Sequence, residues 1–420
     1  MNTIYSRQFI ARVSLLTMAL VLNTVSATEI VPDSAPLAIS NFVKNSINQQ
    51  PPLRAVQADI ASYEANLRAS NQAIYNPELE LSYENSTDIT KTIGLNQTID
   101  WGGQKESRTT VAKAELLKIK TQYAVTAQSF VASLLTGMAQ NQTTKQLAQL
   151  SAETLQLMKD FKLVAKQRHQ AGDLNQIDLN LANLAYSQAL MDRAKILSNV
   201  AEANEGLRAI MGKLPAELPA LPEQLPTPIL QDDLESFLMN LPNIRFNLAD
   251  VQSKKQQIAL RRSEQAWDPT IGVAVGSERG DNLIGLNLTI PLNVRNDFSA
   301  EVDVAHQEMI ASEQRAQQDY RDTRSKLIAT TERYRHLLNA WNNWRQNSRY
   351  SVDQQLILIN KLWLAGDINA TDYLLQIKQA LEIQATGFEL RNELWRTAFE
   401  WMKLTASVDK WLNINLQENN

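Results

Sequence analysis

The chain has 420 residues and a formal net charge of −4, and it contains no cysteine and only three histidines. The lack of cysteine excludes disulfides, thiolate metal sites and a cysteine nucleophile. The slightly acidic balance, without a strongly basic stretch, argues against a nucleic-acid partner, and the three histidines lie too far apart in sequence to form a ligand-spaced pair.

The N-terminal residues 1–27 have the pattern of a secretory signal peptide. Two arginines precede an apolar stretch at 13–25, and the Val-Ser-Ala run at 25–27 fits a small-residue cleavage site. An N-terminal anchor helix is the alternative, but the apolar stretch is shorter than the ~20 residues that a membrane-spanning helix needs. We therefore expect an exported protein whose mature chain begins near Thr28.

The first half of the mature chain, residues 28–213, begins with a helix that ends before an Asn-Pro pair. Residues 78–100 then alternate between apolar and polar side chains, which predicts a β-hairpin with one apolar face. A proline-free helix over 103–170 follows and would be roughly 100 Å long at ~1.5 Å per residue. After a glycine-containing turn, a further helix is expected over 176–211. The polar face of the hairpin carries three acidic residues: Glu78, Glu80 and Glu84.

A proline-rich segment at 214–241 separates this half from the second one. A flexible linker between two domains is the alternative for this segment, but the order of predicted elements continues beyond it in register. We therefore expect it to bulge from the middle of a single architecture. The second half (242–410) is predicted to contain a helix at 243–267, a β-hairpin at 270–292, a long helix at 296–364 and a helix at 370–406, followed by a C-terminal tail at 411–420.

The two halves share sequence as well as the order of their elements. IGLNQTID at 93–100 corresponds to IGLNLTIP at 284–291, and AGDLNQIDL at 171–179 corresponds to AGDINATDY at 365–373. The Asn-Pro pair before the first hairpin is matched by an Asp-Pro pair before the second. Similar segments in the same order, at nearly constant spacing, indicate two tandem copies of one structural unit.

The two hairpins fit strands of an outer-membrane β-barrel, although a half-buried soluble sheet has the same periodicity. Tyr75, Trp101 and Trp267 flank the strands where the helices join them, which is the position of an interfacial aromatic girdle. Four strands are too few to close a barrel, since the smallest barrels have ~8, and open strand edges are not tolerated in lipid. A membrane-embedded chain would therefore form an oligomer of two copies, with eight strands, or of three copies, with twelve.

The long helices predict a coiled coil rather than a globular core. Helices of this length are stable when they pack on others like them, and a sustained seven-residue spacing of apolar residues implies left-handed supercoiling. The fold class is therefore mainly α with a small β part. The positions spaced by seven are Ala182, Ala189, Ile196, Ala203 and Ile210 in one helix, and Leu374, Leu381, Phe388, Trp395 and Met402 in another.

The two glycine-containing turns lie at the end of the molecule opposite the hairpins. Gly172 and Gly366 are expected to end their helices in the left-handed conformation that glycine adopts at low cost. Asn175 and Asn369 are expected to cap the next helices, with an aspartate three residues later that closes a capping box and faces the helix dipole. The candidate site residues in these turns are Gly172, Asp173, Asp178, Gly366, Asp367 and Asp372.

With these features the chain resembles the TolC-like outer-membrane efflux family over residues 28–410. The resemblance rests on the duplicated unit, the Asn-Pro or Asp-Pro pair before each first strand, and the Gly-x5-Asp helix turns. It implies a homotrimeric tube with a 12-stranded barrel in the outer membrane and a long α-helical barrel across the periplasm. IDWGGQKESR (99–108) and IPLNVRN (290–296) are similar to the branch that serves heavy-metal and cation efflux pumps of the RND type.

The resemblance also implies roles for the candidate residues. The two turns would form a periplasmic tip that narrows to a gate, docks the adaptor and gathers carboxylates that favour cations. The family's gate also uses an arginine and a tyrosine near the second turn, and Ile368 and Trp363 stand at the corresponding places, so that lock is not carried over. The three glutamates of the first hairpin would face the barrel lumen.

The leading functional hypothesis is a passive exit duct for metal cations, without catalytic residues, cofactor or resident metal. Its partners would be two further copies of the chain, a periplasmic adaptor, an inner-membrane RND-type pump and outer-membrane lipid. Multidrug or solvent efflux and type I secretion are alternatives within the same fold, and a structural periplasmic coiled coil is the alternative from another class. The duct would take its energy from the inner-membrane partner, because the sequence has no nucleotide-binding loop. An exported enzyme is disfavoured because the sequence has no Ser-His-Asp candidate, metal cluster or Gly-x-Ser-x-Gly motif.

Overall fold

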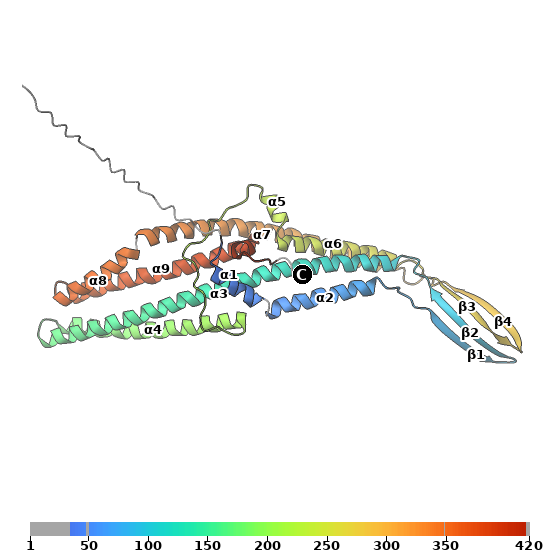
Figure 1. Ribbon diagram of the computed structural model, residues 1–420, viewed down its shortest axis with the longest axis horizontal. Helices are drawn as coiled ribbons and strands as arrows, with labels where there is room; N and C mark the ends of the chain where they lie inside the picture. Colours follow the sequence, from blue (N-terminus) through green and yellow to red (C-terminus); the bar gives the residue numbers. More distant parts are fainter. Residues whose placement is uncertain (1–33, 48–49, 348, 417–420) are drawn as a thin grey trace, which may run out of the picture.

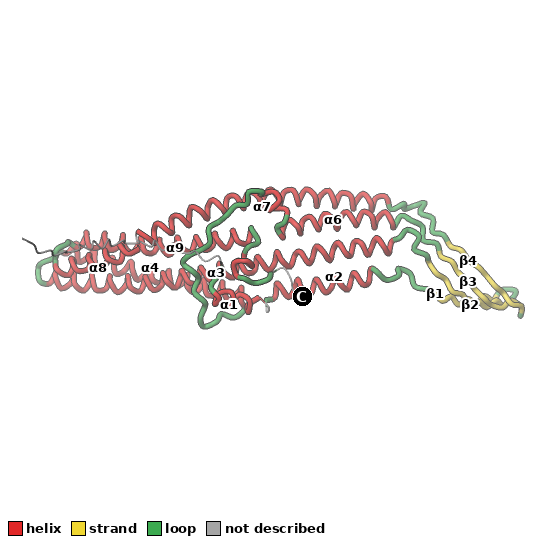
Figure 2. Tube along the Cα trace, turned by 45° about the horizontal axis from the view of Figure 1, so that its top comes forward, coloured by secondary structure: helices red, strands yellow, loops and turns green. Residues whose placement is uncertain are grey.

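The chain is described by a computed structural model that covers residues 34–47, 50–347 and 349–416. The expected signal peptide at 1–27 lies outside the described residues. The molecule is elongated, with all its strands at one end and two helix–helix turns at the other, as Figures 1 and 2 show from two directions. The fold is mainly helical, in agreement with the fold class expected from the sequence.

The first half of the chain forms a helix, a hairpin and a pair of long helices. Proline in the first turn of α2 is compatible with helix initiation because the N–H it lacks would have no intrahelical partner. The long helix, expected over 103–170, begins one residue later than predicted. The elements are α1 (Leu37–Ile47), α2 (Pro51–Ser70), β1 (Glu78–Asn85), β2 (Ile89–Thr98), α3 (Gln104–Gln170) and α4 (Gln176–Met211).

The second half repeats this order after the proline-rich segment, which also contains one short helix. Residues of the expected long helix at 296–364 fall in two helices on either side of residue 348, which lies outside the described residues. The helix expected over 243–267 ends one turn early, where residues 264–266 form turn hydrogen bonds before the Asp-Pro pair. The elements are α5 (Leu234–Met239), α6 (Pro242–Ser263), β3 (Thr270–Glu278), β4 (Asp281–Thr289), α7 (Ser299–Asn347), α8 (Arg349–Ala365), α9 (Ala370–Leu404) and α10 (Val408–Leu412).

The helices lie side by side in two sections along the long axis (Figures 1 and 2). Next to the sheet the order is α2, α3, α6 and α7, which is the order of the strands that these helices join. Toward the opposite end α4 packs on α3, α9 packs on α3, and α8 packs on α9. The long helix α3 therefore runs through both sections and connects them.

The four strands form one antiparallel sheet in the order β1-β2-β3-β4. Arg279 and Gly280, both with positive φ, form the two-residue turn between β3 and β4, as short hairpins require. The register places apolar residues of all four strands opposite one another on a single face. Its two central rows are Leu79, Leu95, Val273 and Leu286, and Leu81, Ile93, Val275 and Ile284.

Two hydrophobic cores hold the helices together. One lies at the middle of the molecule, where α1, α3, α7, α9, α10 and the proline-rich segment meet. The other lies near the turns, between α3, α4, α8 and α9. In the part of the chain that the structure covers, no helix has an apolar stretch long enough to cross a membrane.

Candidate functional site

Both turns at the far end of the molecule have the same helix-ending geometry. Gly172 and Gly366 have φ values of +84° and +87°, and the residue after each glycine donates its backbone N–H to the carbonyl five residues earlier. These bonds, from Asp173 to Arg168 and from Asp367 to Leu362, are both 2.9 Å long and define a Schellman motif. The helix-ending role expected of the two glycines is confirmed.

The asparagines of the turns cap the helices that follow. Asn175 Oδ1 accepts the backbone N–H of Asp178 at 2.9 Å, and Asn369 Oδ1 accepts that of Asp372 at 2.8 Å. In the second turn the Asp372 carboxylate also accepts the side-chain N–H of Asn369 at 2.7 Å. Each aspartate thus lies in the first turn of its helix, where the helix dipole favours a negative charge.

An aromatic cluster joins the two helix pairs beneath these turns. Phe161 of α3, Trp363 of α8 and Tyr373 of α9 contact one another with ring centroids 5.0 to 5.1 Å apart. All three rings are buried, and burial, with a smaller contribution from Asp160, raises the pKa of Tyr373 to about 12. The turns between α3 and α4 (171–175) and between α8 and α9 (365–369), called the first and second tip turns below, are therefore anchored on one packed core.

At the opposite end, the apolar face of the sheet is exposed. Leu81, Ile284 and Leu286 have 72 to 81% of their surface accessible, although each lies at the centre of a strand. Exposed apolar patches of this extent mark an interaction with lipid or with another protein. The predicted interface aromatics Trp101 and Trp267 are exposed at the helix side of the same sheet.

The other face of the sheet carries the predicted acidic residues. Glu78, Glu80 and Glu84 occupy alternate positions of β1 and are exposed. Glu80 accepts a hydrogen bond from Asn96 Nδ2 at 2.8 Å, and Asn96 in turn accepts one from Asn287 Nδ2 at 3.3 Å. The acidic strand thus belongs to a polar face that extends across the sheet.

The third predicted aromatic, Tyr75, takes part in a joint between helices and sheet. Its hydroxyl donates to Asp268 Oδ2 at 2.7 Å, and Gln104 Nε2 donates to the same oxygen at 2.8 Å. The backbone N–H of Trp101 donates to Asp268 Oδ1 at 3.1 Å. Asp268, of the Asp-Pro pair, therefore gathers three donors from the other half of the chain. The sequence marks the Asp-Pro pair as a helix end but gives no sign of this joint.

The middle of the molecule holds contacts that the sequence analysis missed. The indole N–H groups of Trp341 and Trp395 donate to the carbonyls of Glu223 and Pro222 at 3.0 and 2.9 Å. The buried guanidinium of Arg391 lies 4.8 Å from the Trp395 ring centre. The two indole hydrogen bonds, called the clasp below, attach the proline-rich segment to α7 and α9. Abundant tryptophan in the second half was the only sequence signal available.

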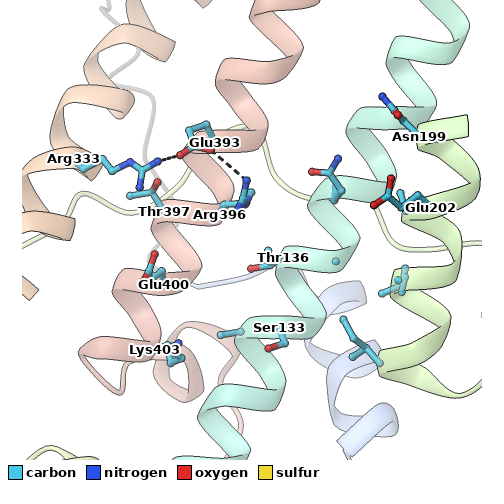
Figure 3. Close-up of a pocket in the computed structure, with 17 residues that line it drawn as sticks. Ser133, Thr136, Asn199, Glu202, Arg333, Glu393, Arg396, Thr397, Glu400 and Lys403 are labelled. Carbon is cyan, nitrogen blue, oxygen red and sulfur yellow. Dashed lines mark hydrogen bonds and ion pairs between the residues drawn. The ribbon is translucent and has the colours of Figure 1, made fainter. Parts of the chain in front are cut away.

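A groove of about 810 Å³ opens near the middle between α4 and α9, with α3 as its floor (Figure 3). Glu393 on its wall forms ion pairs with Arg333 and Arg396. Because these charges partner one another at the surface, the groove has the character of a solvated helix surface. Within the described residues, no group of three or more histidine, aspartate or glutamate side chains could hold a metal ion.

Comparison with known protein families finds a match in the first half of the chain. Residues 42–213 match the model of the family described as "Outer membrane efflux protein". The resemblance to this family that the sequence indicates is therefore confirmed. Among curated proteins, no match is found.

Solved structures share the fold along most of the chain. One is a crystal structure of CusC, whose subject is the conformational changes that accompany folding and transmembrane channel formation. It is 14% identical in sequence, with a TM-score of 0.73, and the match covers 88% of this chain and 92% of the CusC chain. The Campylobacter jejuni outer membrane channel CmeC is 12% identical, with a TM-score of 0.73, and the match covers 99% of this chain and 96% of the CmeC chain. The open state of the Neisseria gonorrhoeae outer membrane channel MtrE is 14% identical, with a TM-score of 0.73, and the match covers 90% of this chain and 93% of the MtrE chain.

Proposed function

We propose that this chain, whose residues 42–213 match the model of the outer membrane efflux protein family, forms the outer-membrane exit duct of a tripartite efflux system. In this proposal three copies close a 12-stranded barrel in the outer membrane, and their helices continue as a tube across the periplasm. The similarity in fold to outer membrane channels supports the proposal.

The observation that carries the proposal is the exposed apolar face of the sheet. Its residues lie in register across four strands, so the face is continuous and its width is that of the whole sheet. Within the described residues the outer edges of β1 and β4 pair with no other strand. Lipid accepts such a face only when all edges are closed, and neighbouring copies would close them by pairing β4 of one copy with β1 of the next.

The duct would be passive and would depend on partners for energy. An inner-membrane RND-type pump and a periplasmic adaptor would deliver the substrate to the tip turns. Asp173, Asp178, Asp367 and Asp372 would surround the tube axis there, and the glutamates of β1 would line the barrel. Rings of carboxylates favour cations over anions, which is consistent with the similarity of residues 99–108 and 290–296 to the heavy-metal branch. Multidrug or solvent efflux is the second candidate, because the same duct would serve either pump.

Membrane fractionation of the native full chain tests the proposal. A closed barrel should remain in the membrane during carbonate extraction and should migrate on gels as an oligomer that dissociates on heating. A periplasmic coiled coil of structural function should be released by carbonate and should show no heat-dependent mobility. Release by carbonate would therefore contradict the duct and favour that alternative.

A further inference from the structure

One arginine crosses from the first tip turn to the second. Arg168, in the last turn of α3, donates through Nη2 to the carbonyl of Trp363 at 2.7 Å and approaches that of Leu364 at 3.3 Å. Both carbonyls lie in the last turn of α8, immediately before Gly366. The guanidinium also lies 4.6 Å from the centre of the Trp363 ring.

Each of these contacts suits a guanidinium. The last carbonyls of a helix carry the negative end of its dipole, so a cation that donates to them is favourable, even though the Trp363 carbonyl also accepts the backbone N–H of Gly366 at 3.1 Å. The planar guanidinium can donate in its plane while it stacks on an aromatic face, which a lysine ammonium cannot do. Arg168 therefore holds the end of α8 by charge, by hydrogen bonding and by stacking at once.

The residue under the guanidinium is itself fixed. Trp363 is only 2% exposed and is stacked on Tyr373, with Phe161 at its edge. Its indole N–H has no hydrogen-bond partner among the described residues. Packing and the Arg168 contact thus determine where this ring lies, and a movement of α8 away from α3 would have to break both.

The tie runs in one direction only. Aligning the two AGD turns places Leu362 of α8 at the position of Arg168 and His169 at the position of Trp363. The second copy of the unit therefore has no arginine that could reach back to the first turn in the same way. In an assembly of several copies, each chain would contribute one such tie.

We propose that Arg168 is a positioning residue that ties the second tip turn to the first and thereby limits the aperture of the tip. This inference rests on the proposed function, because an aperture exists only if the two turns border a conducting path. The proposal predicts that the aperture of the tip is kept narrow by a contact within one chain, from Arg168 of α3 to the end of α8.

The test compares three variants of the full chain with the native protein: Arg168→Ala, Arg168→Lys and the control Lys166→Ala. Lys166 is an exposed cation two residues earlier on the same helix. Hydrogen–deuterium exchange of backbone amides at 362–372 reports the tie itself. Single-channel conductance in planar bilayers, on samples that remain heat-modifiable oligomers, reports its effect on the aperture.

In Arg168→Ala we expect the backbone amides at 362–372 to exchange several-fold faster than in the native protein. We also expect its single-channel conductance to be several-fold higher. Arg168→Lys should be intermediate, because the ammonium keeps the charge without the stacking, and Lys166→Ala should match the native protein in both measurements. Unchanged exchange in Arg168→Ala would overturn the tie. Faster exchange with native conductance would show a structural contact only and would overturn its role at the aperture.

The failure of the proposed function would look different. In that case the native chain itself would form no channel, whereas the exchange measurement would still establish whether Arg168 restrains the second turn. If the native chain conducts and Arg168→Ala matches the native protein in both measurements, the duct stands and this inference falls.

Discussion

The Tyr75 hydroxyl donates to the Asp268 carboxylate at 2.7 Å, which joins the two halves of the chain at the point where helices meet the sheet. The hydrogen bond to Asp268, followed by burial, raises the pKa of Tyr75 from 10.0 to about 12. The folded protein therefore prefers the neutral phenol.

This relationship predicts an alkaline dependence of stability. Because the folded pKa lies above the unfolded one, the contribution of Tyr75 is complete below pH 10 and is lost as the pH rises to about 12. Tyr75→Phe should lower the free energy of unfolding by about 1 kcal/mol at neutral pH, allowing for its partial exposure. Thermal melting followed by circular dichroism at several pH values measures both effects. If Tyr75→Phe lost as much stability between pH 10 and 12 as the native chain, Tyr75 would not be the responsible group.

The clasp on the proline-rich segment predicts different costs for two neighbouring tryptophans. Trp341→Phe removes the N–H that the Glu223 carbonyl accepts, whereas the buried indole N–H of Trp344 has no partner among the described residues. Both changes remove the same atoms from one stacked pair. Trp341→Phe should therefore cost about 1 kcal/mol more than Trp344→Phe, since it removes a hydrogen bond that Trp344 does not make. Limited proteolysis at 214–228 should accelerate only for Trp341→Phe, and equal rates would refute the clasp.

The two faces of β1 should respond differently to a positive charge. Leu81→Lys places the charge on the apolar face, where lipid would make it cost ~2–4 kcal/mol near the membrane midplane. Ser82→Lys places it on the polar face of the same strand, where we expect a cost near zero. The yield of heat-modifiable oligomer in the membrane fraction measures the difference. Equal yields for the two variants would contradict a lipid contact of this face.

Two helical glycines should respond in opposite ways to alanine. A Cβ at Gly387 would lie 2.2 Å from Trp344 Cζ2, so Gly387→Ala must displace a packed indole and should cost about 1–3 kcal/mol. A Cβ at Gly206 meets no atom within 4 Å, so Gly206→Ala should stabilise the chain by about 0.4–1 kcal/mol. Melting temperatures of the two variants test the packing of α9 against α7. A stable Gly387→Ala variant would show that this packing is looser than described.

Local sequence signals determine much of this fold. The ends of α3 and α4 lie within one residue of the predicted limits, because glycine and asparagine at the turns define where a helix can end or begin. The strands were predictable because apolar and polar residues alternate with a period of two. The sequence repeat also anticipated that the same order of elements occurs in both halves.

The contacts between distant segments could not be predicted in the same way. Nothing local to Arg168 indicates that it reaches Trp363, and the resemblance implies a gate arginine near the second turn rather than the first. Asp268 was visible as a helix-ending Asp-Pro pair, but its three donors come from the other half of the chain. Such contacts depend on how the halves pack, and a single sequence does not encode that packing in any short pattern.

Planar-bilayer conductance of the purified native chain tests the central claim most directly. The duct predicts stepwise insertion of channels with a small, cation-selective conductance. Asp178→Asn/Asp372→Asn, which keeps the backbone caps at both turns and removes two charges per chain, should reduce that selectivity. A folded sample that never inserts would contradict the outer-membrane duct. Native channels selective for anions would contradict the proposed cation path.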